Sequence, residues 1–257
     1  MEKEKIISVM KRYELKYYLN KDQLAFFEEK IASYMKLDQY GLTTIASLYF
    51  DTPDFRLITK SIEKPKFKEK IRLRGYGLVN EDKPTFLEVK RKCEGIVYKR
   101  RITLSEKEAL NFISTCETTK QNQIDREVEA FLKAHYPLEA KYLIIYDRKA
   151  FYQENSDLRI TIDRNPRYRT TKLDLHTSME GIPLVEEGGA ILEVKVQNAI
   201  PLWLTSILSQ GKIYQTSFSK VGRAHLKELS KRRTLQQKEV QLLSLTKKGE
   251  LEYGFVV

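Results

Sequence analysis

The sequence contains few of the residues from which metal and redox sites are usually built. Of its 257 residues, two are cysteines and three are histidines. Cys93 and Cys116 form no CxxC pair, which excludes a cysteine zinc site and is typical of a reducing compartment. The histidines at 135, 176 and 225 lie far apart, so each is expected to have a surface or structural role.

Long apolar runs and nucleotide-binding signatures are also missing. No apolar run approaches the roughly 20 residues that span a bilayer. The opening MEKEKIISVM lacks the apolar segment of a signal peptide, so we expect a soluble, cytoplasmic protein. The patterns GxxxxGK[ST] and GxGxxG are absent, which excludes a P-loop and a dinucleotide fingerprint. Three scattered histidines give no support to a Ser/His/Asp arrangement.

What the chain has in excess is positive charge. Lysine and arginine number 46 against 35 acidic residues, for a formal net charge of +11 and a pI of about 9.4. Hydrophobic residues make up 41%, enough to bury a core. This balance predicts a polyanionic partner: nucleic acid, an anionic membrane surface or a phosphate-rich small molecule. The length suits a single barrel.

Segments of alternating polarity are interleaved with amphipathic helices. Strands are predicted at 12–19, 44–50, three times within 70–101, and at 140–148, 157–163 and 190–196. Helices are predicted at 21–35 after Asn20, from Ser105 with a capping box to Glu108, at 121–135, from Pro201 and at 221–245. A lysine-rich connection is expected around 64–68, and irregular structure at 164–187.

The stretch 70–101 places charge on every second residue of three neighbouring strands. Arg72 and Arg74 share one strand face, and Lys99 and Arg101 share another. Between them, Glu88 is followed by lysines at 90 and 92 in the same alternation. We therefore infer one strongly cationic surface with a carboxylate set into it.

Extending the alternation to the other strands and to the SFSK segment gives a larger set of side chains on one face. Its basic members are Lys16, Arg72, Arg74, Lys90, Lys99, Arg101, Arg148, Arg159, Lys195 and Lys220, and its acidic members are Glu14, Glu88, Asp163 and Glu193. These could be the solvated face of an ordinary antiparallel sheet. The recurrence of arginine, whose planar fork suits phosphate, and the apolar stripes of the helices favour a face that points into a barrel.

Such a face predicts an anionic ligand. Two like charges 4 Å apart repel by roughly 4 kcal/mol at an effective dielectric near 20, and a triphosphate or longer phosphate chain would relieve that repulsion. The carboxylates would then bind Mg²⁺ or Mn²⁺, with Glu193 the first choice. Glu14 and Glu88 are weaker choices, since either could pair with a lysine. Ser219 and Lys220, at a strand-to-helix junction, could bind phosphate, although a plain N-cap serine is an equal alternative.

Taken in order, several segments resemble one known family. They are RYELKYYL, SLYFDTP, KIRLRGYG, FLEVKRK, YKRR, YDRKAF, LRITID, ILEVKV and SFSK. Between about residues 10 and 225 this order resembles the VTC domain, the polyphosphate polymerase domain of the triphosphate tunnel metalloenzyme superfamily. The resemblance implies an α+β fold: a closed antiparallel β-barrel, or tunnel, of about eight strands with helices outside. We assign 1–225 to this domain and 226–257 to a basic C-terminal helix and tail packed on it.

The resemblance also implies an activity, transfer of the γ-phosphoryl of ATP to a growing polyphosphate chain with Mn²⁺ or Mg²⁺. Carried over by motif, one set of residues holds phosphates: Lys16, Arg72, Arg74, Lys90, Lys99, Arg148, Arg159, Ser219 and Lys220. Glu193 takes the metal, and we add Arg101 and Lys195 as substrate contacts. Polymerases of the family belong to membrane complexes, which implies a separate membrane protein as partner. Nucleic acid is not expected, because no RNP-like stretch or recognition helix is present.

Two departures from the family pattern bear on the reaction. The superfamily's ExExK signature stands here as Arg12-x-Glu14-x-Lys16, without its first carboxylate, which argues against a two-metal hydrolase. Ser217 stands where the polymerases favour lysine, so chain elongation is not implied by that position. A tripolyphosphatase or nucleoside triphosphatase of the same fold and a non-catalytic polyphosphate sensor are the alternatives.

Overall fold

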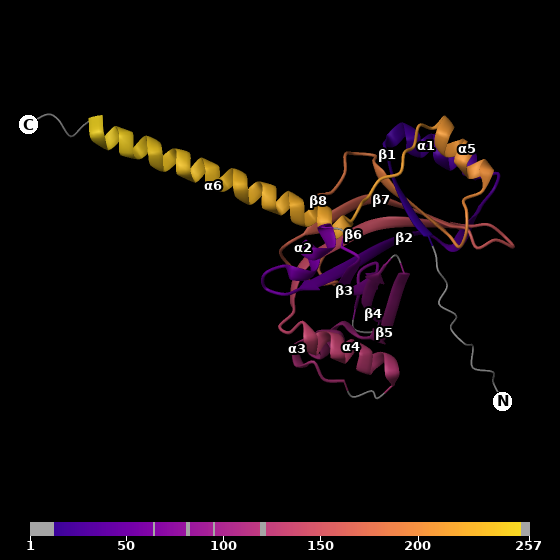
Figure 1. Cartoon of the computed structure of the whole chain (residues 1–257), viewed down its shortest axis with the longest axis horizontal. Coiled ribbons are helices and arrows are strands. Elements are labelled where there is room, and N and C mark those ends of the chain that lie inside the picture. Colours follow the sequence, from indigo (N-terminus) through magenta and orange to yellow (C-terminus); the bar gives the residue numbers. More distant parts are fainter. Residues whose placement is uncertain (1–12, 64, 81–82, 95, 119–121, 253–257) are drawn as a thin grey trace, which may run out of the picture.

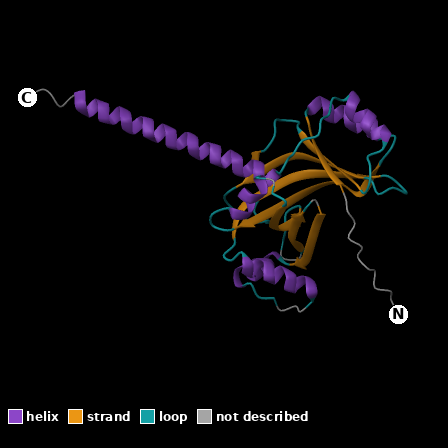
Figure 2. Cartoon of the chain, in the orientation of Figure 1, coloured by secondary structure: helices purple, strands orange, loops and turns teal. Residues whose placement is uncertain are grey.

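A computed structural model describes residues 13–63, 65–80, 83–94, 96–118 and 122–252, with side chains as far as 238. A strongly curved antiparallel sheet forms the body, with helices against it, and the last helix projects far from the body (Figures 1 and 2). The α+β class implied by the family resemblance is confirmed.

The sheet is built from consecutive and distant strands in the order β1-β9-β7-β6-β2-β3-β4-β5, with β8 beside β7. Every strand pair is antiparallel. The strands are β1 (Tyr13–Leu19), β2 (Lys36–Asp51), β3 (Phe67–Tyr76), β4 (Thr85–Cys93), β5 (Ile96–Leu104), β6 (Glu139–Tyr152), β7 (Arg159–Arg169), β8 (Ile182–Pro183) and β9 (Ala190–Val196).

The closed barrel expected from the family resemblance is not confirmed. Among the described residues, no ladder joins the edge strands β1 and β5. The free side of β1 is met instead by an irregular segment: Tyr17 bridges to Gln215, and the N–H of Thr216 donates to the carbonyl of Lys16 at 2.7 Å. These bonds take up part of the edge that a closing strand would need.

Even without closure, the two ends of the sheet approach each other on its concave side. The Nζ of Lys90 in β4 lies 3.4 Å from a carboxylate oxygen of Glu14 in β1. The concave face therefore encloses a space lined by residues that are far apart along the sheet.

Four of the six helices in the described part of the chain cover the convex face in two groups. The helices are α1 (Lys21–Ile31), α2 (Arg56–Ile62), α3 (Glu106–Thr115), α4 (Gln123–Ala134), α5 (Leu202–Gln210) and α6 (Lys220–Glu252). Apolar residues of α1 and α5 pack on β1, β7 and β9, while those of α3 and α4 pack on β3, β4 and β5. These two cores bury the apolar half of each alternating strand, which leaves the charged half on the concave face.

A third apolar cluster lies on the concave face itself. Ile58 of α2 and Val221 and Ala224 of α6 pack against residues of β2 and β6, including Ile45 and Tyr142. In α6, the Nδ1 of His225 also lies 3.0 Å from the hydroxyl of Tyr142. Helix α2 and the first turns of α6 therefore cover part of the concave face and bring the α6 N-terminus next to the charged part.

Several predicted elements differ from the structure in extent. Strand β7 continues to Arg169, inside the stretch expected to be irregular, and α1 ends at Ile31 rather than 35. In the helix predicted at 121–135, helical spacing from the buried Val128 favours a core position for Ile124, but Ile124 is 42% exposed.

Helix α2 was missed, because its N-terminus is stabilised by a residue outside it. The carboxylate of Asp51, at the end of β2, accepts the N–H groups of Leu57 and Ile58 at 2.8 and 2.7 Å. These two hydrogen bonds join residues six and seven positions apart, so the sequence has no local capping pattern that would predict the helix. Within the part of the chain that the structure describes, no helix is long and apolar enough to cross a membrane.

Candidate functional site: a cationic concave face

Strand register places the predicted charged residues on one face of the sheet. Arg72 lies opposite Glu88, which lies opposite Arg101. Across the other half, Lys16 lies opposite Glu193, and Arg148 lies opposite Asp163. Directly opposed residues of antiparallel strands project to the same side, so the alternation predicted from sequence is realised as one continuous surface.

The first group of these side chains, the Glu88 cluster, consists of Glu88, Arg72, Arg74, Lys99 and Arg101. The Glu88 side chain is 1% exposed. Arg72 Nε donates to it at 2.9 Å, Arg101 Nε at 2.7 Å, and Lys99 Nζ lies 2.6 Å away. Burial alone would raise the pKa of Glu88, but Arg72, Arg74 and Lys99 together hold that pKa far below its usual range. One buried carboxylate thus holds four basic side chains in place.

The second group, the Glu193 cluster, consists of Glu193, Asp163, Lys16, Arg148 and Lys220. Arg148 forms a bidentate pair with Asp163, with Nε and Nη2 distances of 2.5 and 2.8 Å, and Lys220 also contacts Asp163. Lys16 and Lys220 lie 3.0 and 3.6 Å from Glu193. Burial opposes ionisation of both acids, but Lys220, Lys16 and Arg148 lower the pKa of Glu193, and Lys220 and Arg148 lower that of Asp163.

Tyr146 connects the two clusters. Its hydroxyl accepts a hydrogen bond from Arg74 at 3.3 Å. Its ring centroid lies 5.1 Å from the guanidinium carbon of Arg148 and 4.5 Å from Lys220 Nζ, as in cation–π pairs. The sequence reasoning missed Tyr146, although it lies two residues before Arg148 in the same alternation.

Tyr49 on β2 is a second tyrosine that the sequence reasoning missed. Its hydroxyl accepts from Arg72 at 2.9 Å. Burial raises the pKa of Tyr49, but Arg72, Lys70 and Arg74 outweigh burial and lower that pKa to about 8. Tyr49 is therefore an acceptor that helps to orient an arginine of the Glu88 cluster.

Glu14 and Lys90 bridge the open side of the face. Glu14 lies 3.4 Å from Lys90 and 3.2 Å from Lys16. Burial opposes ionisation of Glu14, but Lys90 and Lys16 lower its pKa to about 2. Lys195 lies 3.8 Å from Glu193, at the margin of the Glu193 cluster.

Arg159 is on this face by register but is turned away from both clusters. It lies opposite Lys195 in β9. Its Nη1 donates to the carbonyls of Ser156 and Leu158 at 3.1 and 3.0 Å, and its guanidinium carbon lies 5.7 Å from the ring centroid of Tyr152. Arg159 is exposed, so it lies at the rim in this conformation.

The α6 N-terminus contributes Ser219 as well as Lys220. The Oγ of Ser219 accepts from the N–H of Gly222 at 3.2 Å, as an N-cap does, and also from Lys70 Nζ at 3.0 Å. Lys70 was missed, although it precedes Arg72 by two residues and so continues the same alternation. Burial lowers the pKa of Lys70 to about 8, and the positive charges of Lys16 and Lys90 lower it further, whereas Tyr49 acts in the opposite direction.

Carboxylates for a metal ion are few. No group of three or more histidine, cysteine, aspartate and glutamate side chains that could hold a metal occurs in the described part of the chain. Both oxygens of Glu88 contact basic groups. Glu193 and Glu14 share Lys16 between them. The protein can thus offer one or two carboxylates, which suits Mg²⁺-type sites that take most ligands from phosphate and water.

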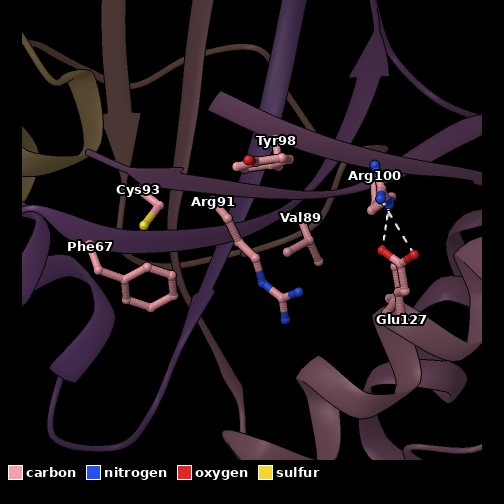
Figure 3. A pocket seen from close by; sticks show the side chains of 8 residues that line it. Phe67, Val89, Arg91, Cys93, Tyr98, Arg100 and Glu127 are labelled. Atoms are coloured by element: carbon pink, nitrogen blue, oxygen red, sulfur yellow. Dashed lines mark hydrogen bonds and ion pairs between the residues drawn. The ribbon is translucent and has the colours of Figure 1, made fainter. Parts of the chain in front are cut away.

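A separate pocket of about 260 Å³ lies on the convex face, between β3, β4, β5 and α4. Figure 3 shows Arg91 and Arg100 among apolar side chains there, with Arg100 paired to Glu127. Arg91 Nε also has a partner, Glu69, at 2.7 Å. None of the predicted site residues lines this pocket. Each of its arginines has its own carboxylate partner, whereas four basic side chains share Glu88 on the concave face.

Comparison with known proteins gives one family match. The VTC domain model matches residues 11–226. No curated protein matches the sequence.

Solved structures give distant likenesses in fold. A putative adenylate cyclase from Vibrio parahaemolyticus is 13% identical with a TM-score of 0.46, covering 85% of this chain and 99% of that chain. One from Bacillus halodurans is 16% identical with a TM-score of 0.47, covering 82% and 96%. A putative adenylyl cyclase from Hippeastrum, described as having a dominant triphosphatase activity, is 14% identical with a TM-score of 0.49, covering 81% and 92%. Likenesses at this level carry no argument about function.

Proposed function

Because the chain belongs to the VTC domain family, whose model matches residues 11–226, we propose that it is a metal-dependent polyphosphate polymerase. It would transfer the γ-phosphoryl of ATP to a phosphate chain held on the concave face. The observation that supports this most directly is the pair of clusters around Glu88 and Glu193, in which buried carboxylates hold an excess of lysine and arginine on one concave surface.

The clusters suit phosphate because their basic groups are already positioned. Arginine forks bind phosphate oxygens through paired N–H groups, and Glu88 and Asp163 hold Arg101 and Arg148 by one side of the fork. Arg72 is held on both sides, by Glu88 and by Tyr49. Fixed side chains lose little entropy when a ligand arrives. Positive charge that exceeds the buried carboxylates is then available to the phosphates.

In the proposed reaction, a terminal oxygen of the polyphosphate chain attacks the γ-phosphorus of ATP. A P–O bond forms there, and the bond between that phosphorus and the β–γ bridging oxygen breaks, so ADP leaves. The charge in such a transition state is spread over phosphoryl oxygens, and catalysis consists mainly of positioning and charge neutralisation. Arg72, Arg74, Lys99, Arg148 and Lys220 would supply both, with no nucleophile on the protein.

A divalent metal fits the donors near Glu193 when the ligand supplies the remaining oxygens. We propose Glu193 as the protein ligand, with Glu14 as a second candidate, and a bound Mn²⁺ or Mg²⁺ would neutralise phosphate charge. Glu88 is better suited to hold arginines, because basic groups lie 2.8 and 2.6 Å from its two oxygens, whereas those nearest Glu193 Oε2 lie 3.7 and 3.8 Å away. The first carboxylate of the ExExK signature is missing here, which agrees with a metal site that takes few of its ligands from the protein.

Incubation of the purified protein with ATP and Mn²⁺ tests the proposal. Long polyphosphate on a gel, together with ADP, is the expected result. Orthophosphate without polyphosphate would replace the polymerase by a triphosphatase, in which water is the acceptor. Tight binding of polyphosphate without any turnover of ATP, with Mn²⁺ or Mg²⁺, would indicate a non-catalytic sensor.

Glu193→Gln separates the metal from phosphate binding. We expect metal-dependent turnover to fall at least about 100-fold, while affinity for tripolyphosphate is retained or increases, because one negative charge is removed from the face. Glu139→Gln, at an exposed carboxylate of β6, is the matched control and should not change turnover. Unchanged turnover in Glu193→Gln would place the metal elsewhere.

A further inference from the structure

Lys70 occupies the junction between the two clusters. It lies two residues before Arg72 of the Glu88 cluster and opposite Lys90, which reaches Glu14 in β1. Its Nζ donates to Ser219 Oγ at 3.0 Å, and Ser219 directly precedes Lys220 of the Glu193 cluster. Lys70 therefore lies beside residues of both clusters.

Unlike the arginines around it, Lys70 is paired with no carboxylate in the described part of the chain. Among the described residues, no carboxylate lies within salt-bridge distance of its Nζ, whereas Arg72, Arg148 and Lys220 each contact one. The side chain is half-buried, so water screens its charge poorly. A half-buried cation whose hydrogen bond goes to a neutral hydroxyl gains most when an anion arrives.

We propose that Lys70 binds a phosphate group together with Ser219 and Lys220, and so joins the two clusters into one continuous oligophosphate site. In the free protein Lys70 is held by Ser219, which leaves ammonium protons of Lys70 for ligand oxygens. This inference rests on the proposed function, because it takes a phosphate chain as the ligand. It adds a binding residue on β3 and a role for the contact between β3 and α6.

The proposal has a protonation signature. Because burial and neighbouring lysines lower the pKa of Lys70 to about 8, part of the Lys70 population is neutral at pH 8. A bound phosphate favours the charged form, so binding takes up a proton there. The groups facing Lys70 are Lys16 of β1, Tyr49 of β2, Lys68 of β3, Lys90 of β4 and Ser219 of α6. Since Tyr49 and Lys99 also have pKa values of about 8, only the difference between wild type and a Lys70 variant reports on Lys70.

Calorimetric titration with inorganic tripolyphosphate, without nucleotide or metal, tests Lys70. We expect Lys70→Met to weaken binding about 10-fold or more at pH 7, the effect of one charge-assisted hydrogen bond. Lys70→Arg should retain most of the affinity. Lys107→Met, an exposed lysine on α3, removes the same charge from another part of the molecule and should change affinity less than about twofold. Proton uptake at pH 8, measured in two buffers of different ionisation enthalpy, should be smaller for Lys70→Met than for wild type.

Stability of the free protein separates a binding role from a structural one. Removal of an uncompensated cation should leave the melting temperature of Lys70→Met unchanged or raised, so loss of affinity in a well-folded variant supports the proposal. Wild-type affinity in Lys70→Met would overturn the Lys70 assignment and leave the proposed function intact. Loss of affinity in both Lys70→Met and Lys70→Arg with a lowered melting temperature would also overturn it, in favour of a structural contact. Failure of the wild type to bind tripolyphosphate would refute the proposed function itself.

Discussion

Arg72 and Arg74 differ in how they are held, although they are neighbours on the same strand face. Arg72 is fixed by Glu88 and by Tyr49. Arg74 is 6% exposed, lies 3.9 Å from Glu88 and donates to Tyr146, while its Nε lacks a hydrogen-bond partner. Together they supply two of the three guanidinium groups of the Glu88 cluster, which makes the pair the sharpest test of phosphate binding.

Replacing Arg72 and Arg74 together by alanine should weaken tripolyphosphate binding at least about 100-fold, because two charge-assisted contacts are lost. The free energy of unfolding should change by no more than about 1 kcal/mol, because Glu88 keeps Lys99 and Arg101 as partners and repulsion among the cations falls. Titration calorimetry and urea unfolding measure the two quantities. In the control variant, alanine replaces Arg91 and Arg100, two arginines of the convex pocket, and tripolyphosphate binding should not change. Retained affinity in the first variant would support an ordinary solvated sheet face.

Glu88→Gln should lower stability, because the buried partner of four cations is removed. We expect a loss of about 3 kcal/mol in the free energy of unfolding at pH 7. The pKa of Glu88 lies well below its value of about 4.3 in an unfolded chain. The stabilisation from Glu88 is therefore complete above that unfolded value and is lost as pH falls below it. The difference between wild type and variant should shrink between about pH 5 and pH 3 in urea unfolding. A constant difference would mean that the charge of Glu88 is not what stabilises the fold.

Among the elements, α6 has two parts with different surroundings. Its first turns pack on the sheet through His225 and through Glu228 and Lys231, which contact the hydroxyl of Tyr168. Lys231 is the last residue whose described side chain hydrogen-bonds the body, and the rest of the helix extends away from it (Figure 1). Only the first part can influence the phosphate site.

A chain ending at Lys238 should therefore bind tripolyphosphate with unchanged affinity, within about twofold, and unfold at a similar temperature. Its 33-residue helix loses only turns beyond the described contacts. A chain ending at Val221 would lose His225 and Glu228 and should be much less stable, which provides the contrast. Thermal unfolding and calorimetry measure both. Weakened binding in the longer chain would show that the distal helix acts on the site.

Elements with local signals were predicted well, and those that depend on distant partners were not. Asn20 and Ser105 cap their helices as predicted, and β9 has the predicted bounds. Helix α2 was missed because Asp51 caps it from the preceding strand. The extent of β7 was missed because its second half is paired by β6 and β8 rather than specified by alternation.

At the scale of the whole molecule, the net charge of +11 and the excess of basic side chains on the concave face set the response to ligands. Tripolyphosphate at 100 times its dissociation constant should raise the free energy of unfolding by about 2.7 kcal/mol. For a protein of this size that corresponds to a rise of about 5 °C or more in melting temperature. Differential scanning fluorimetry measures it.

Ionic strength provides the control for this stabilisation. Sodium chloride of equal ionic strength should raise the melting temperature much less, because it screens without filling the site, and it should weaken tripolyphosphate binding. Equal shifts from sodium chloride and tripolyphosphate would indicate general screening instead of a specific site.

The sequence alone determined the chemistry of this protein: alternation placed lysine and arginine on one side of successive strands, and the motif order indicated the VTC family. Tertiary structure decided how those charges are arranged. Cross-strand register set Glu88 beneath four cations, and curvature brought Lys90 to Glu14. Packing of α6 placed Ser219 on Lys70. These contacts join residues 11 to 149 positions apart, and alternation within one strand carries no information about which strand lies alongside.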